Sequence, residues 1–169
     1  SNFFEIPTDC PQRDERLGWT GDAHVFATAA SINMNTASFF DKWLRDLREA
    51  QREDGAVSCI APDILKNSFG AAVWADAIIA CPWIIYQHFG DRRILQENYS
   101  SMKKWLQYQL DTAENFIRPK SDFADWLALD TIETPSELVG TAMLAYGCNI
   151  LSRTAEILQI PEDSKIYLQ

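Results

Sequence analysis

Apolar residues recur at helical spacing through most of this chain, and no segment shows the strict alternation of a half-buried strand. Residues 71–89 are apolar on nearly every side, which is typical of a buried helix, although Pro82 should kink it. The neighbouring segments are amphipathic, so buried and surface helices should alternate in pairs. The pattern predicts an all-α toroid or solenoid, with helices over residues 23–34, 36–52, 71–89, 94–114 and 135–158.

Composition limits the possible classes of protein. The chain has 169 residues and 47% hydrophobic content, which is enough for one domain with a real core. A net charge of −9 argues against a nucleic-acid partner and against an anionic membrane surface. No apolar run approaches the roughly 18 residues of a membrane-spanning helix. We therefore expect neither a nucleic-acid nor a membrane partner, while the compartment (cytoplasmic, periplasmic or secreted) stays open.

Metal-binding and disulfide patterns are weak. The chain has two histidines, and its cysteines show no CxxC spacing, so we expect no metal site, no cofactor and no disulfide framework. His24 falls just inside a predicted helix and is expected to be a structural hydrogen-bonding residue. The cysteines are expected to be buried thiols; they are Cys10, Cys59, Cys81 and Cys148.

The segment from Asp9 to Asp22 carries the densest chemistry. It holds four carboxylates, two arginines and one tryptophan within 14 residues, directly before a helical pattern. Carboxylates beside arginine and an aromatic ring suit a sugar, because acids bind hydroxyls or donate protons and the ring stacks on the sugar face. The alternative is a surface loop in which Asp22 caps the helix and the arginines neutralise neighbouring acids.

Tryptophans next to carboxylates recur in the loops that precede successive buried helices. Such loops should meet at one rim of a helical ring, so the function is expected there. A single buried tryptophan more often belongs to the core, and we expect this for Trp43, Trp83 and Trp105. The recurring pairs are Trp19 with Asp22, Trp74 with Asp76, and Asp125 with Trp126.

The segment Thr8–Ala23 (TDCPQRDERLGWTGDA) resembles the signature of bacterial α-L-rhamnosidases of glycoside hydrolase family 78. The later motifs VWADA, DWLA and TPSELVGTA are similar to that family's following motifs, in the same order. The resemblance implies a catalytic domain that is an (α/α)6 barrel and that hydrolyses terminal α-L-rhamnosides with inversion. Residues 1–169 would be the N-terminal portion of that domain, about half of the barrel.

The resemblance also implies roles for individual residues. Glu15 corresponds to the family's general acid, and its pKa should rise beside the other carboxylates of the segment and fall beside Arg13. The general base would lie outside this chain, so the isolated chain should have negligible activity, and an exposed apolar edge should favour self-association. The residues implied to bind rhamnose are Asp9, Arg13, Trp19, Asp22, Trp74 and Trp126, with Asp125 as a further contact.

Two other functions remain open on the sequence. The first is another glycosidase on the same (α/α)6 barrel, because paired acids serve many glycosidases. The second is a non-catalytic helical module that binds carbohydrate or acts as a scaffold. The expected partner in the leading interpretation is a rhamnose-containing glycoside or polysaccharide.

Overall fold

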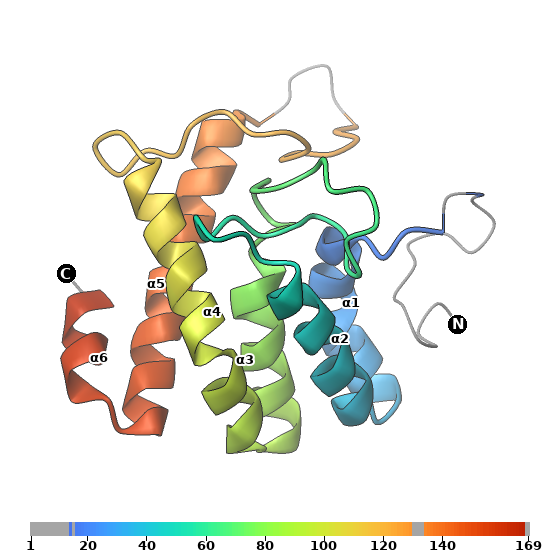
Figure 1. The fold of residues 1–169 in the computed structure, drawn as a ribbon, viewed down its shortest axis with the longest axis vertical. Coiled ribbons are helices and arrows are strands. Elements are labelled where there is room, and N and C mark those ends of the chain that lie inside the picture. Colours follow the sequence, from blue (N-terminus) through green and yellow to red (C-terminus); the bar gives the residue numbers. More distant parts are fainter. Residues whose placement is uncertain (1–13, 15, 130–133, 168–169) are drawn as a thin grey trace.

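The computed structural model describes residues 14, 16–129 and 134–167 of the chain. Within these ranges the secondary structure consists of helices and three isolated β-bridges, so the all-α prediction is confirmed (Figure 1). The helices are α1 (Thr20–Asn33), α2 (Ala37–Glu49), α3 (Ala77–Phe89), α4 (Arg92–Asp111), α5 (Ser136–Leu158) and α6 (Pro161–Tyr167).

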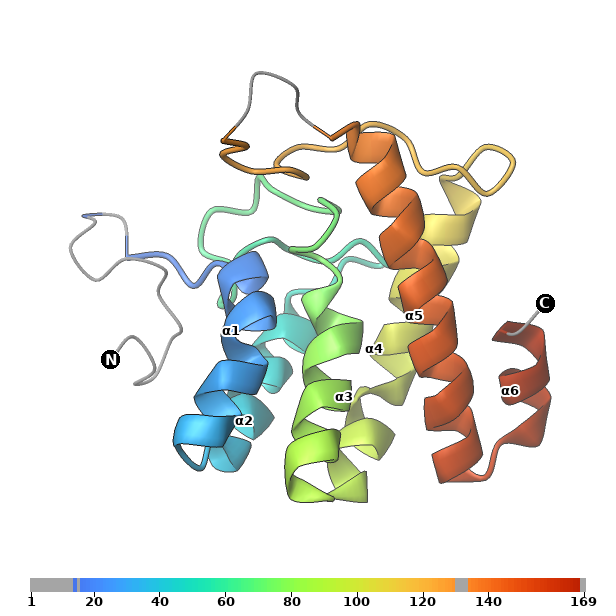
Figure 2. The ribbon, with the colours of Figure 1, turned by 180° about the vertical axis from the view of Figure 1, so that it is seen from behind.

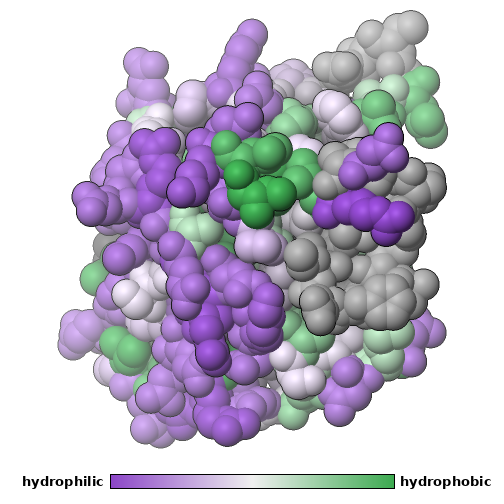
Figure 3. Space-filling view, turned by 45° about the vertical axis from the view of Figure 1, so that its right-hand side comes forward, coloured by the Kyte–Doolittle hydropathy of each residue, from purple (hydrophilic) through white to green (hydrophobic). Residues whose placement is uncertain are grey.

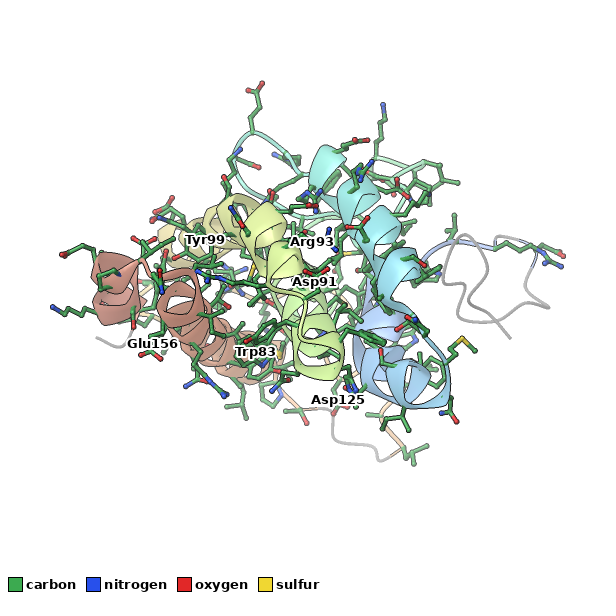
Figure 4. All side chains as sticks on the ribbon, turned by 90° about the horizontal axis from the view of Figure 1, so that it is seen from below. Trp83, Asp91, Arg93, Tyr99, Asp125 and Glu156 are labelled. Atoms are coloured by element: carbon green, nitrogen blue, oxygen red, sulfur yellow. The ribbon has the colours of Figure 1, made fainter. Side chains whose placement is uncertain are left out.

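The helices form two rows. One row contains α1, α3 and α5, side by side in Figure 2, and the other contains α2 and α4, as the end-on view in Figure 4 also shows. Helix α3 packs against α1, α2, α4 and α5, and α6 packs against α5. This alternation along the chain is the pairing of inner and outer helices that the sequence predicts.

The burial of each helix follows its sequence. In α3 all residues from Ala77 to Trp83 are buried, as the continuous apolar run requires for a helix packed on several sides. Helices α2 and α4 bury one face each. The three tryptophans expected in the core are all buried there: Trp43, Trp83 and Trp105.

Three details differ from the sequence prediction. Helix α3 begins at Ala77 instead of residue 71, because a turn built around Val73 precedes it. Asp22 lies in the first turn of α1, whose N-cap is Trp19, so the interpretation of Asp22 as the cap is wrong. Helix α6 was not expected.

The long loops between the pairs lie at one end of the molecule. Helices α1, α3 and α5 all start at this end, and residues 50–76, before α3, and 112–129, before α5, lie there (Figure 1). The first loop is tied to the start of α1, because Thr20 N donates to Cys59 O at 2.9 Å and Ala61 N donates to Gly18 O at 2.8 Å. These bonds fix the position of one loop against the segment that carries the opening motif.

The remaining surface is mixed. Hydrophilic residues cover most of the coloured part of the face in Figure 3, and hydrophobic residues gather in small groups on it. On α1 the side chains of Val25 and Ile32 are 70% and 72% exposed, so this helix has an uncovered apolar face. Self-association through such a face stays a prediction. No helix in the described ranges is long and apolar enough to cross a membrane.

The thiols of the described cysteines are free, as expected. Cys59 and Cys81 are buried and Cys148 is partly buried, whereas Cys10 lies outside the described residues.

Candidate functional site

A cavity of about 430 Å³ opens at the loop end of the molecule, between the first turn of α1 and the loops that precede α3 and α5. Its wall combines aromatic rings with carboxylates. Five of the residues that the sequence assigns to a sugar site line it together, although they come from three separate segments: Trp19, Asp22, Trp74, Asp125 and Trp126.

The other three candidates, Asp9, Arg13 and Glu15, lie outside the described residues. Their neighbours Asp14 and Arg16 are described and exposed. The roles assigned to the three candidates therefore stay predictions.

The indole of Trp74 lies directly on the first turn of α1. A Cβ atom added to Gly21 would be 2.6 Å from Cδ2 and Cε2 of that indole, far inside normal carbon contact. Glycine at this helical position therefore allows the ring to approach the backbone. The close approach places Trp74 beside Asp22 at the cavity.

The turn that presents Trp74 has a strained backbone. Val73 has φ 71°, a conformation that a β-branched residue rarely adopts. Two hydrogen bonds hold it: Val73 N donates to Asp76 Oδ2 at 2.8 Å, and His24 Nδ1 donates to Val73 O at 3.0 Å. A carbonyl oxygen can only accept, so Nδ1 of His24 carries the proton. The expectation that His24 is a structural hydrogen-bonding residue is confirmed.

Asp76 stabilises this turn and does not line the cavity. The sequence pairs it with Trp74 as a rim carboxylate, but its side chain is buried and does not line the cavity. Its Oδ1 accepts from Trp105 Nε1 at 2.8 Å and from Gln109 Nε2 at 3.1 Å, both on α4. Burial raises the pKa of Asp76, while the hydrogen bond from Trp105 opposes the rise.

Aromatic rings form a continuous wall around Phe123. Its ring centroid lies 5.7 Å from that of Trp19, 4.9 Å from that of Trp74 and 5.4 Å from that of Trp126. Sequence reasoning missed Phe123; the only signal was its place two residues before Asp125 in the DFADW run. Nε1 of Trp19 is buried and has no hydrogen-bond partner among the residues that the structure describes.

Asp125 belongs to the same loop and lies on the α1–α3 side of the end-on view (Figure 4). Its Oδ2 accepts from Thr134 N at 2.9 Å. That hydrogen bond from Thr134 lowers the pKa of Asp125. Asp125 is therefore an ionised acceptor at neutral pH, which suits the binding of sugar hydroxyl groups better than proton donation.

The arrangement has the chemistry of a carbohydrate site. Indole faces stack on the C–H faces of a sugar ring, while carboxylates accept from its hydroxyl groups. Across the ranges 14, 16–129 and 134–167, no group of three or more His, Cys, Asp or Glu side chains is placed to hold a metal ion.

Comparison with known proteins identifies curated relatives of one kind. A curated α-L-rhamnosidase of Formosa agariphila is 41% identical over 172 residues, covering 98% of this chain and 19% of that protein. One from Streptomyces avermitilis is 43% identical over 154 residues, covering 91% of this chain and 15% of that protein. The chain thus spans about a fifth or less of the length of these relatives.

Solved structures match the fold closely. The crystal structure of Streptomyces avermitilis α-L-rhamnosidase complexed with L-rhamnose superimposes with a TM-score of 0.93 at 40% identity, covering 99% of this chain and 16% of that one. The α-L-rhamnosidase of Dictyoglumus thermophilum gives a TM-score of 0.93 at 36% identity, covering 99% of this chain and 19% of that one. These matches fit the expected partial barrel of paired helices. The family model for the bacterial alpha-L-rhamnosidase 6 hairpin glycosidase domain matches residues 1–169, and the chain belongs to that family.

Proposed function

We propose that this chain is the N-terminal portion of the catalytic domain of an α-L-rhamnosidase, and that its cavity binds the terminal rhamnose of the substrate. One observation carries the proposal: five residues assigned to the sugar from the sequence line a single cavity. The complex of the Streptomyces avermitilis relative with L-rhamnose supports the identity of the sugar.

The described residues would bind rhamnose in two ways. The indoles of Trp74 and Trp126 offer apolar faces for the C–H groups of the pyranose ring and for its methyl group. Asp22 and Asp125 offer carboxylate oxygens for its hydroxyl groups, and charged acceptors form the stronger hydrogen bonds. Because Asp22 lies in the first turn of α1, the fixed geometry of that helix sets its direction.

Glu15 is the proposed general acid. Only three residues separate it from Trp19, which lines the cavity, so the chain is short enough to keep Glu15 within reach of a bound sugar. Its proton would pass to the glycosidic oxygen as that bond breaks. Asp9 and Arg13, in the same segment, are proposed to bind the rhamnose.

The proposed reaction inverts the anomeric centre. A second carboxylate, acting as general base, would activate a water molecule on the face opposite Glu15, with the two carboxyl groups about 6.5–9.5 Å apart. We propose that this base comes from a part of the enzyme outside the 169 residues. The isolated chain should therefore have negligible turnover.

The test uses the full-length enzyme that contains this sequence, with p-nitrophenyl α-L-rhamnoside as substrate. E15Q should lower kcat by about a hundred- to ten-thousandfold while L-rhamnose still binds, because only the proton donor is lost. The matched control is E114Q, which removes an exposed carboxylate in the loop after α4 and should leave kcat unchanged. Proton NMR of the first product should show β-L-rhamnose, as inversion requires.

Each other outcome contradicts a defined part of the proposal. An α-anomeric first product would contradict the inverting mechanism. Hydrolysis of other p-nitrophenyl glycosides, but not of the rhamnoside, would indicate another glycosidase on this fold. Sugar binding without turnover in the parent enzyme would favour a non-catalytic carbohydrate-binding module.

A further inference from the structure

We propose that Phe123 is a positioning residue of the sugar site, whose ring holds the three cavity indoles in the arrangement that binds the sugar. The inference rests on the proposed function, because it concerns the same cavity. It adds a residue that neither the opening motif nor the indole–carboxylate pairs indicate.

The first support is the pattern of ring contacts. Phe123 meets the rings of Trp19 and Trp126 edge-on, at interplanar angles of 82° and 86°, and meets Trp74 at a tilt of 38°. These are favourable arrangements for aromatic pairs, because the positive edge of one ring faces the negative face of another. Each of the three cavity indoles therefore forms a ring pair with Phe123. Phe123 thus joins its own loop to the two other segments that line the cavity.

The second support is the backbone that presents this ring. Phe123 has φ 71°, and Ala124 N donates to Asp122 O at 3.0 Å, which closes a three-residue turn around it. Such a turn with a positive central φ is rare and strained for a residue that carries a Cβ. Strained backbone persists where the surroundings hold it, and the ring contacts of Phe123 are the surroundings that the structure shows. The loop and the indoles therefore fix one another.

The third support is the position of the ring relative to the sugar-binding groups. Phe123 lines the cavity and is followed directly by Ala124, Asp125 and Trp126, which line it too. A shift of the Phe123 ring would move Asp125 and Trp126 with it, because they share one short loop. Removing the ring should therefore weaken sugar binding through the orientation of its neighbours.

The experiment compares F123A, F123L and F123Y in the full-length enzyme. F123A should raise both the KM for p-nitrophenyl α-L-rhamnoside and the inhibition constant of L-rhamnose by about tenfold, with a smaller change in kcat, because the proton donor is untouched. F123Y, which keeps the ring, should restore both constants, whereas F123L, which keeps only apolar bulk, should not. Near-UV circular dichroism should show a changed indole signal in F123A and F123L.

A matched control is available on the same rim. Phe116 also has a positive φ, 64°, but its side chain is 75% exposed and it does not line the cavity. F116A should leave the kinetic constants and the indole signal as in the parent. This control separates the loss of a ring in the site from the loss of a phenylalanine in a strained loop.

The outcomes are decisive in both directions. Parent-like constants in F123A, or equal constants in F123L and F123Y, would overturn the proposal. If F123A does not fold, the comparison of F123L with F123Y decides. If the parent enzyme binds no L-rhamnose, the proposed function is wrong. The positioning role is tested separately, because an unchanged near-UV circular dichroism signal of the indoles in F123L would overturn it.

Discussion

Replacing Gly21 by alanine tests how the first turn of α1 positions Trp74. The new Cβ would be 2.6 Å from two atoms of the indole and 2.9 Å from a third. Carbon atoms pack comfortably at about 3.5–4.0 Å, so the ring must move away by about 1 Å. Since Trp74 lines the cavity, the movement should disturb the wall against which we propose that the sugar packs.

The magnitude follows from two opposing terms. Overpacking costs about 1–3 kcal/mol, while alanine is favoured over glycine within a helix by about 1 kcal/mol. The free energy of unfolding should thus fall by about 0–2 kcal/mol. A displaced indole should cost about 1–2 kcal/mol of sugar binding, which is five- to thirtyfold in affinity.

The assay is titration of the full-length enzyme with L-rhamnose, together with urea unfolding. The matched control is G147A, also in a helix, where the nearest atom is the flexible end of Ile79 at 3.2 Å. That variant should bind L-rhamnose like the parent. Parent-like affinity in G21A, with an unchanged indole signal in near-UV circular dichroism, would refute the reasoning, because the turn would then accommodate a methyl group without moving the ring.

Three further predictions concern the buried groups. D76A should lower the free energy of unfolding by about 3–5 kcal/mol in urea titrations, because it leaves the donors of Trp105, Gln109 and Val73 buried and unpaired. Burial raises the pKa of Asp76 above its unfolded value of about 4, so the unfolded chain loses this proton at a lower pH than the folded chain does. The free energy of unfolding should therefore fall as pH rises from about 4 to the folded pKa and then level off. The D76N variant should lack this dependence on pH. Burial also raises the pKa of the Cys59 thiol, so it should react with a thiol reagent such as DTNB only after unfolding; fast labelling of Cys59 itself in the native chain, located by peptide mass spectrometry, would contradict this.

The fold could be predicted because its helices carry their burial pattern in the sequence. Residues 77–89 form a buried helix as the apolar run indicates, and 37–49 present one apolar face. The start of α3 could not be predicted, because residues 71–75 are as apolar as the helix itself. The turn before α3 is held by a hydrogen bond from Val73 N to the carboxylate of Asp76, which in turn accepts from Trp105 on α4. The local sequence does not show this contact.

The grouping of candidate residues at one cavity could be predicted where residue type alone indicates chemistry. The indoles of Trp19, Trp74 and Trp126 were identified because each stands beside a carboxylate in a loop before an inner helix. The roles of two residues, Asp76 and Phe123, could be assigned only from the structure. Asp76 looks like a rim carboxylate in sequence but bonds inward, and Phe123, which no motif indicated, forms ring pairs with all three indoles.

Ala124 shares the unusual backbone of Phe123. Ala124 has φ 33°, and Phe123 before it has φ 71°, so the loop holds two successive residues in a region that favours glycine. Glycine would adopt these backbone angles with less strain, so the conformation of this loop must be stabilised by its side-chain contacts. The ring contacts of Phe123 are among them.

The buried Asp76 connects the row of α2 and α4 to the cavity. A carboxylate is costly to bury, so its place here calls for a compensating role beyond packing. Its bonds to Trp105 and Gln109 fix it to α4, and its bond to Val73 holds the strained turn that presents Trp74. No apolar side chain could hold that backbone N–H. The wall of the cavity is therefore positioned by the packing of α4, and the rim loops need little regular structure of their own.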